Sequence, residues 1–384
     1  MSFIMNIRSV AKYESKILVR SWFFRIFTLL AVVFLGFFNF AMMLMEDNFG
    51  LWFAKSVSSN IPYLNLLLLN TGQAVVAVFL SSEFLKRDKK LDTSEVFYVR
   101  PLSNAEYVVG KIWGNLRVFL FLNLLVLAIV LAFNFMASGV TVDLPAYLVY
   151  FFLISIPTLI FIIGLSIFLM LLLNNQALTF ILLLGYIGLT LFYIQDKFYY
   201  LFDYMVYNLP LFKSTIVGFS NLELILNHRA IYFFAGLGFI FFTIFLFKRL
   251  PNARRSHYPW LFLSFCMFLL MVTAGFRHVR SILWEGEMRA LYTSINNKYV
   301  YEPKMAIDYY DISVEQKSET IRSVVGMEGT ALAASEVFIF CLNPGLRVEE
   351  VKDGEKLLNF KREEQILAVD FGRKIEKGDT ISFS

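Results

Sequence analysis

The stretch SSEFLKRDKKLDTSEVFYVRPLSNAEYVVGK, residues 81 to 111, separates two apolar runs that are each long enough to cross a membrane. Ser103 is followed three residues later by Glu106, the spacing of a capping box, in which each side chain bonds the other residue's backbone N–H. The pattern predicts a helix that starts near Asn104 and continues to Met136. Such a helix is about 50 Å long, whereas the hydrocarbon core measures about 30 Å. Its first turns are therefore expected to project from the bilayer.

A second capping pattern lies upstream in the same stretch. Asp92 and Glu95 repeat the capping-box spacing with Asp as the cap, which predicts a short helix over residues 93 to 99. Arg100 precedes Pro101, and the residue before a proline is disfavoured in a helix. A short capped helix across the end of a long one offers a partner protein a rigid contact. A merely solvated basic loop is the alternative.

Composition places the chain among membrane proteins. Hydrophobic residues make up 58% of the 384 residues and charged residues only 17%, outside the usual range of soluble domains. The net charge of +5 is unevenly spread: residues 1 to 275 carry 20 Lys and Arg against 12 Asp and Glu, and residues 276 to 384 carry 15 against 18. Two regions in different solvents explain this division better than a nucleic-acid surface, so no nucleic-acid partner is expected.

Charge-free runs of spanning length predict seven transmembrane helices in a mainly α polytopic protein. A long uncharged run between Leu144 and Gln195 is divided into two spans by the polar letters NNQ at residues 174 to 176, and Pro157 predicts a kink in the first of these two. The other five predicted spans are Ile26 to Met45, Ile61 to Ser82, Val118 to Ala137, Ala230 to Phe247 and Tyr258 to Phe276.

Lys and Arg counts predict the orientation, because short cytoplasmic loops are enriched in them. With the N-terminus inside, the inner segments hold sixteen and the outer loops four. The inner segments are 1 to 25, 83 to 117 and 248 to 257, and the outer loops are 46 to 60, 138 to 143 and 195 to 229. Seven spans then place everything after Phe276 outside.

The N-terminal segment is expected to stay attached, because its apolar run has full spanning length and lacks a clear cleavage site. It also has a two-sided helical pattern, with basic residues at steps of four. This predicts an interfacial helix whose basic side faces lipid headgroups; an ordinary solvated helix is the alternative. The basic residues are Arg8, Lys12, Lys16 and Arg20, and the apolar residues Val10, Tyr13 and Ile17 lie on another side.

The opening stretch resembles the cytoplasmic loop of ABC-2 type transporter permeases, roughly E…GT.E.L…P.S…Y..GK. The resemblance covers residues 1 to about 250, including six spans and a long outer segment before the sixth. Asp92 stands where that family commonly has Gly. The matching residues are Glu83, Thr93, Glu95, Pro101, Ser103, Tyr107, Gly110 and Lys111.

The resemblance implies a six-helix permease core paired with a second core, as a homo- or heterodimer, in a bacterial inner membrane. It also implies a coupling helix near Asp92 to Val99 that docks on a separate ATP-binding subunit, which holds ATP and Mg²⁺, so that this chain carries no cofactor and is not itself an enzyme. The expected contact residues in this coupling region are Glu83, Asp92, Thr93, Glu95, Val96 and Val99, with Ser103 and Glu106 as the helix cap.

Two further regions lie beyond these motifs. Uncharged pieces of the outer segment, residues 204 to 212 and 214 to 222, are too short to cross, and the family resemblance implies short re-entrant helices; a plain interfacial loop is the alternative. From Met305, strand-like runs alternate with the turns NPG, DG and KGD, which predicts an outer β-sandwich-like domain. The sequence of residues 338 to 384 is similar to the N-terminal domain of M1 family aminopeptidases. The run TISFS at its end predicts a truncated final strand.

The expected domains are therefore an amphipathic helix, a permease core with its coupling loop, a linker with the seventh span, and a β domain. Their bounds are 1–25, 26–250 with the loop at 83–111, 251–276 and 277–384.

Catalytic motifs are missing from the sequence. The chain has no G-x-x-x-x-G-K-[ST] loop for phosphates and no H-E-x-x-H pair, and its three histidines, His228, His257 and His278, are isolated in sequence. Cys266 and Cys341 are expected on opposite sides of the membrane, and no carboxylate or lysine is expected in mid-span. Two classes of function remain: the permease of an ATP-driven exporter, and a membrane-anchored fragment of an M1-like aminopeptidase or a permease-peptidase fusion.

Overall fold

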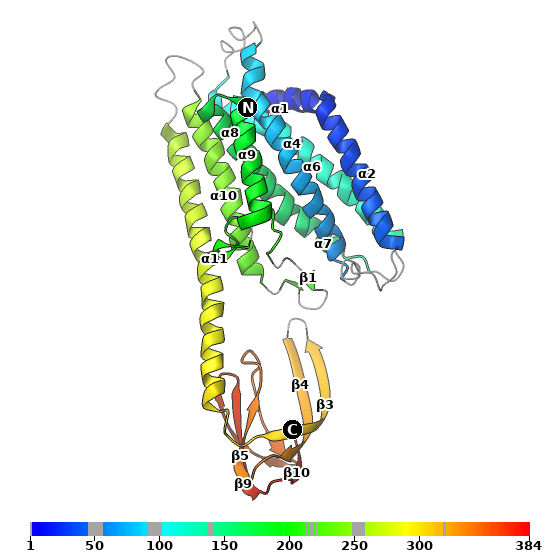
Figure 1. The fold of residues 1–384 in the computed structure, drawn as a ribbon, viewed down its shortest axis with the longest axis vertical. Helices are drawn as coiled ribbons and strands as arrows, with labels where there is room; N and C mark the ends of the chain where they lie inside the picture. The colour runs from blue at the N-terminus through cyan, green and yellow to red at the C-terminus, as the bar shows by residue number, and fades with distance from the viewer. Residues whose placement is uncertain are drawn as a thin grey trace. The chain divides into compact units, whose positions relative to one another are not determined.

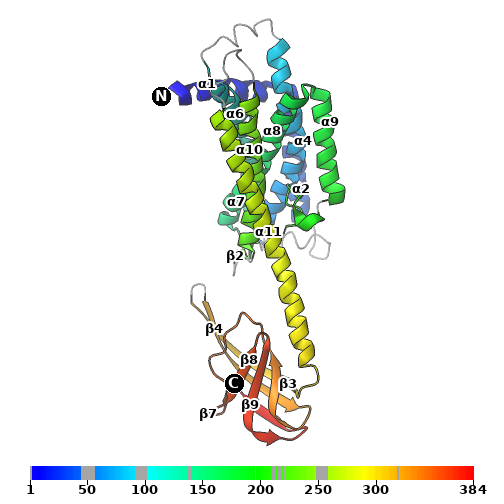
Figure 2. The same ribbon diagram turned by 90° about the vertical axis from the view of Figure 1, so that its left-hand side faces the viewer.

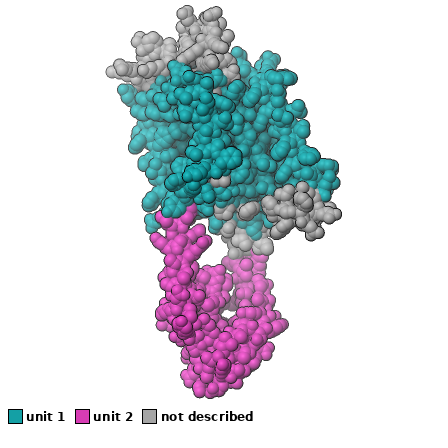
Figure 3. Space-filling view, in the orientation of Figure 1, with its two compact units in different colours: residues 1–280 teal, residues 281–384 magenta. Residues whose placement is uncertain are grey.

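The computed structural model describes residues 2–44, 57–90, 102–136, 141–194, 196–209, 211, 213–214, 218–219, 221–247, 258–317 and 320–384, with the backbone alone for residues 2 and 81–90. The chain divides into two compact units, residues 1–280 and residues 281–384, which Figure 3 colours separately.

The first unit is a helical bundle. Among the described residues, seven helices are long and apolar enough to cross a membrane, as the sequence predicts, so the chain is a multi-pass membrane protein. Helix α1 lies across one end of the bundle, at an angle to the long helices (Figure 1 and Figure 2). The α-helices are α1 (Ser2–Arg20), α2 (Trp22–Leu44), α4 (Asn60–Lys90), α6 (Asn104–Met136), α7 (Leu144–Tyr150), α8 (Ile156–Leu173), α9 (Gln176–Leu189), α10 (Leu222–Leu246) and α11 (Tyr258–Lys298).

Polar signals set several helix boundaries. Helix α6 has the predicted bounds. At the NNQ break, Asn174 ends α8 in the left-handed conformation, with φ of 53°, and the Asn175 side chain accepts a bond from Leu178 N as the cap of α9. The sequence placed the sixth span too late, because α10 begins at Leu222, eight residues before the predicted start. Helix α11 continues 22 residues past the predicted end of the seventh span.

The predicted irregularity at Pro157 is a π-helical turn, η1 (Phe151–Ser155), which joins α7 to α8. Pro157 has no N–H, so it cannot donate to the carbonyl of Leu153 four residues earlier. A second π-helical turn, η2 (Thr190–Ile194), ends the fifth span. Such turns leave backbone carbonyls for other donors.

Helices α8 and α10 touch backbone to backbone. A Cβ added to Gly164 would lie 2.6 Å from the carbonyl oxygen of Gly236, and one added to Gly236 would lie 2.7 Å from the carbonyl oxygen of Ile160. Small residues allow this close approach between membrane helices.

The second unit contains two three-stranded antiparallel sheets, ordered β10-β4-β3 and β5-β9-β8. The strand-like runs predicted from Met305 onward form strands, and a short ribbon of β6 and β7 precedes β8. The strands are β3 (Met305–Lys317), β4 (Thr320–Ala331), β5 (Ser335–Cys341), β6 (Lys352–Asp353), β7 (Lys356–Leu357), β8 (Asn359–Glu363), β9 (Ile366–Ile375) and β10 (Thr380–Phe383).

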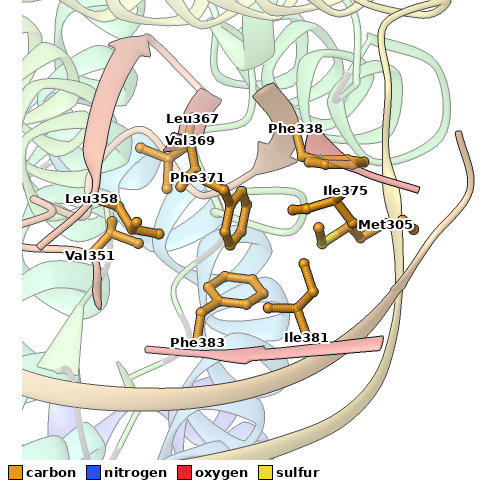
Figure 4. Close-up of a cluster of buried hydrophobic side chains, with 11 residues drawn as sticks. Met305, Phe338, Val351, Leu358, Leu367, Val369, Phe371, Ile375, Ile381 and Phe383 are labelled. Atoms are coloured by element: carbon orange, nitrogen blue, oxygen red, sulfur yellow. The ribbon is translucent and has the colours of Figure 1, made fainter. Parts of the chain in front are cut away.

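One apolar core joins the two sheets, so the β unit is a sandwich. Phe371 of β9 packs edge-on against Phe338 of β5 and against Phe383 of β10, with ring centroids 6.0 Å and 5.5 Å away. Figure 4 shows these side chains converging between the strands. The predicted turns hold Gly354 and Gly378 at positive φ, where glycine is favoured.

Candidate functional site

The predicted capping box is present at the start of α6. The backbone N–H of Glu106 donates to Ser103 Oγ at 3.1 Å, and the backbone N–H of Ser103 donates to Glu106 Oε2 at 2.6 Å. The other carboxylate oxygen, Glu106 Oε1, accepts a bond at 2.9 Å from the Asn6 side chain of α1. Asn104 Nδ2 donates to the carbonyl of Phe247 at 2.6 Å, just after α10. The cap therefore connects three helices that are distant in sequence.

Helix α1 packs directly on α6 along a surface that we call the α1–α6 joint. A Cβ added to Gly110 would lie 2.7 Å from Val10 Cβ, and one added to Gly114 would lie 2.7 Å from Glu14 Cβ and 2.9 Å from the carbonyl oxygen of Ala11. Only glycine permits this approach. The two helices are therefore matched in shape over at least one turn.

Polar groups fix the same joint. Lys111 Nζ lies 3.0 Å from Glu14 Oε1, and their side chains are only 2% and 4% exposed. Arg117 donates to the carbonyl of Ala11 at 2.7 Å and to Ser15 Oγ at 2.5 Å. Removing one partner of a buried ion pair leaves an uncompensated charge, so the pair strongly favours this one arrangement of the two helices.

The basic side of α1 faces away from the joint. Arg8, Lys12, Lys16 and Arg20 are all exposed, as predicted. The apolar residues of α1 lie in two surroundings: Ala11 and Leu18 are buried, whereas Tyr13 is 61% exposed. Val10 packs on Gly110 of α6, while Phe3, Ile4, Met5 and Val19 are exposed, so the interfacial role of α1 stays a prediction.

The predicted contact residues lie mostly outside the described residues. Glu83 is in the last turns of α4, where the backbone alone is described. The residues Asp92, Thr93, Glu95, Val96 and Val99 are outside the described ranges, so their role stays a prediction. The described structure thus shows both flanks of the predicted coupling loop: α4 extends to Lys90, and the cap of α6 begins at Ser103.

A buried arginine forms a second polar centre, and sequence reasoning missed it. Arg229 of α10 is 2% exposed. Its guanidinium donates to the carbonyls of Leu153, Ile154 and Tyr204 at 2.6, 3.4 and 3.0 Å, and to Thr158 Oγ1 at 2.8 Å. The prediction counted Arg229 in the outer loop, because its charge was taken as the boundary of the apolar span.

Arg229 compensates the defect that Pro157 introduces. The carbonyl of Leu153 cannot receive a bond from Pro157, and Arg229 Nε donates to this carbonyl instead. The π-helical turn places the Ile154 carbonyl within reach of the same guanidinium. A charged group is costly inside a membrane protein unless it is fully paired, and these four acceptors supply the pairing.

The segment between η2 and α10, which was predicted to lie outside the membrane, packs against this centre. The predicted helix over residues 204 to 212 is wrong for its described residues, which form turns; Phe198–Tyr200 is a 3₁₀ turn, and β1 (Lys213–Ser214) pairs with β2 (Gly218–Phe219). The alternative of an interfacial loop stays a prediction, because the segment is buried only in part. Its fully or nearly fully buried residues include Asp203, Tyr204, Met205, Val206, Leu209 and Leu211.

Side chains from several helices hold the backbone of this buried segment. Tyr63 of α4 donates to the carbonyl of Val206 at 3.1 Å, Tyr150 of α7 donates to the carbonyl of Leu211 at 2.6 Å, and Tyr232 of α10 donates to that of Leu201. Phe198, Tyr199 and Tyr200 are all left-handed, with φ between 52° and 62°. This conformation is unfavourable for such residues, so the tertiary bonds must maintain it.

Burial also affects the acid in this segment. Asp203 is fully buried and accepts bonds from the backbone N–H groups of Tyr207 and Asn208 at 2.9 and 2.8 Å. Loss of solvent raises the pKa of the Asp203 carboxyl, while these two amides and the charge of Arg229 oppose the rise.

Two histidines meet at the same place. The rings of His228 and His278 are 5.1 Å apart, although the sequence analysis treated them as isolated. Their Nε2 atoms donate to the successive carbonyls of Tyr200 and Tyr199, at 3.0 and 2.8 Å. In the described part of the chain, no three His, Cys, Asp or Glu side chains gather into a set that could hold a metal ion.

A third polar cluster crosses the middle of the bundle. Asn123 of α6 donates to Gln73 of α4 at 2.8 Å and accepts from Ser155 at 2.8 Å and from Asn70 at 3.2 Å. Nearby, Asn39 of α2 and Asn65 of α4 exchange bonds at 2.7 and 3.1 Å. These amides stand out in the sequence as polar residues within apolar runs. Their mutual bonding indicates that they fix the helices relative to one another.

Comparison of the chain with models of known protein families and with curated protein sequences finds no match.

Proposed function

We propose that this chain is the transmembrane permease subunit of an ATP-driven ABC exporter. The observation that carries the proposal is the α1–α6 joint with its capping box. The predicted coupling loop leads into Ser103, and from Ser103 the buried contacts of Glu106, Lys111 and Gly114 fix α6 to α1. A movement imposed on the loop would therefore displace α1 and α6 together.

In this proposal the ATP-binding subunit is a separate protein that holds ATP and Mg²⁺. It contacts residues 92 to 99, and closure of two such subunits moves the coupling loops of two paired permease cores. The N-terminus faces the cytoplasm and the β unit faces the outside of a bacterial inner membrane, in accord with the Lys and Arg counts. The exported substrate stays unassigned.

The buried segment held by Arg229 fits the opposite end of such a pathway. Figure 1 shows α1 at one end of the helical bundle and β1, which ends the buried segment, at the other. At one end of the bundle, the coupling loop and α1 can transmit a movement to α6. At the other end, the segment held by Arg229 can close the pathway. Such a bundle can open alternately at its two ends. We propose that release of the Arg229 bonds accompanies outward opening.

The β-sandwich favours a second candidate, a membrane-anchored part of an M1-like aminopeptidase or a permease-peptidase fusion. The similarity in sequence covers residues 338 to 384, and two sheets around one core fit the β-sandwich that it implies. A pure anchor, however, has no need of a helix locked by a buried ion pair or of a coupling loop.

Reconstitution with an ATP-binding subunit, to be sought among the neighbouring genes, tests the proposal. The chain alone should show no ATP hydrolysis, and the complex should hydrolyse ATP. Glu95→Lys should reduce co-purification, whereas Glu336→Lys, an exposed charge reversal in the β unit, should not. Hydrolysis by the chain alone, or co-purification that survives both Glu95→Lys and deletion of residues 93 to 99, would contradict the assignment.

A further inference from the structure

One sheet of the β-sandwich extends beyond its partner sheet. Met305 and Ile307, at the base of β3, contact the core. A bulge between Ile307 and Tyr309 inserts one residue, so the side chains that continue the core-facing side are Tyr310, Ile312 and Val314. The register places Met327 and Val325 of β4 opposite the first two of these.

The outer half of this side is apolar and uncovered. Tyr310, Ile312, Val314 and Ile321 are 53%, 57%, 59% and 60% exposed, and Val325 is half-buried. We call these five residues the open face. None of them belongs to the core cluster that the second sheet covers.

Charge is confined to the other side of the same hairpin. Over residues 310 to 317 and 320 to 327, the alternation of strands places only Gln316 and Ser323 beside the apolar residues of the open face. Asp311, Glu315 and Arg322 all point the opposite way. A contiguous apolar surface free of charge is typical of a protein–protein contact.

We propose that the open face binds the open face of a second copy of this chain, hairpin against hairpin. A surface without charge is complementary to itself, so a two-fold contact buries no unpaired ion. Four side chains exposing roughly 100 Å² each on two copies would bury roughly 800 Å², which is the size of a weak interface. Both copies are carried in one membrane by α11, which raises their effective concentration.

The chemistry argues against the bilayer as the occupant. The hairpin is only two strands wide here, so insertion of the open face would bring Asp311 and Glu315 close to the headgroups. Lys317 ends β3, and its side chain pairs with Glu315 at 3.0 Å in a well solvated position. A strand surface that continues a sandwich core is instead suited to cover by another sheet. The inference does not depend on ATP-driven transport.

Cysteine crosslinking of the full-length chain in proteoliposomes tests the contact. In a background of Cys266→Ser and Cys341→Ser, Ile312→Cys and Val314→Cys place thiols on the open face. Ser313→Cys is the matched control, because Ser313 is also exposed but its side chain points to the opposite side of the same strand. Mild oxidation should form dimers of the 312 or 314 variant at least ten times faster than of the control.

Each other outcome overturns the proposal. Equal rates for all three variants would indicate random collision, and absence of dimers in all three would show that the open faces do not meet. A last measurement uses an environment-sensitive dye attached to the thiol of the Ile312→Cys variant. The protein is dispersed in detergent, and phosphatidylglycerol vesicles are added. If no crosslink forms and the emission of the dye shifts, the open face binds lipid and not a second copy. Two permease cores that co-purify without crosslinked hairpins would leave the transport proposal intact and refute this one.

Discussion

Gly114→Ala should detach α1 from α6, although alanine is the better helix former. Alanine favours a helix over glycine by about 1 kcal/mol. Here the new Cβ would lie 2.9 Å from the carbonyl oxygen of Ala11, a backbone atom that can move only with the whole of α1. Overpacking of this kind costs about 1–3 kcal/mol. The net effect is a destabilisation of the joint by up to about 2 kcal/mol, increased by any stretching of the Lys111–Glu14 pair.

Trypsin can measure this change, because Lys12 and Lys16 are exposed but lie within the helix, which must unfold locally to be cleaved. When opening is faster than cleavage, the cleavage rate follows the population of the detached helix. A cost of up to about 2 kcal/mol should raise that population by up to roughly 30-fold. Gly188→Ala in α9 is the matched control, since an added Cβ there meets no atom within 4 Å. Equal cleavage of the two variants would refute the reasoning about the joint.

Three further substitutions test the buried polar groups. Arg229→Met leaves four acceptors without their donor and should cost about 3 kcal/mol; hydrogen exchange of the buried outer segment should rise, and the exposed Arg289→Met should leave it unchanged. Lys111→Met alone should cost about 3 kcal/mol, whereas adding Glu14→Leu should restore most of the loss, as thermal unfolding will show. Because burial raises the pKa of Asp203, the folded state binds its proton more tightly, so stability is greatest below the ordinary carboxyl pKa and falls as pH rises through the raised value. Asp203→Asn should flatten that dependence in thermal melts that start below the ordinary carboxyl pKa, about 4, and continue upward in pH.

The sequence predicted the features that depend on local signals. Span number follows from apolar runs, and the start of α6 follows from Ser103 and Glu106, whose side chains bond within one turn. The left-handed turn at Phe198–Tyr200 could not be predicted, because aromatic residues disfavour that conformation and only distant side chains maintain it. The start of α10 was missed because Arg229 was treated as a loop residue. Its bonding partners lie about 25 and 75 residues away, so no local pattern reveals that the charge is satisfied.

Pro157 and Arg229 form one structural unit, in which each residue satisfies hydrogen bonds that the other leaves unmet. A proline in a membrane helix leaves a carbonyl without its donor, and a lone arginine in the same environment lacks acceptors. Each residue alone is costly. Together they remove each other's defect, because Arg229 Nε donates to the Leu153 carbonyl that Pro157 leaves free.

The guanidinium of Arg229 has further N–H donors, and one of them bonds the carbonyl of Tyr204. The position of the buried outer segment is thus tied to the conformation of the fourth span. A change in the pitch of η1 would move the Leu153 and Ile154 carbonyls, and with them the guanidinium that holds Tyr204. In an exporter, this link provides a physical route by which rearrangement of the helices releases the segment at the end opposite α1.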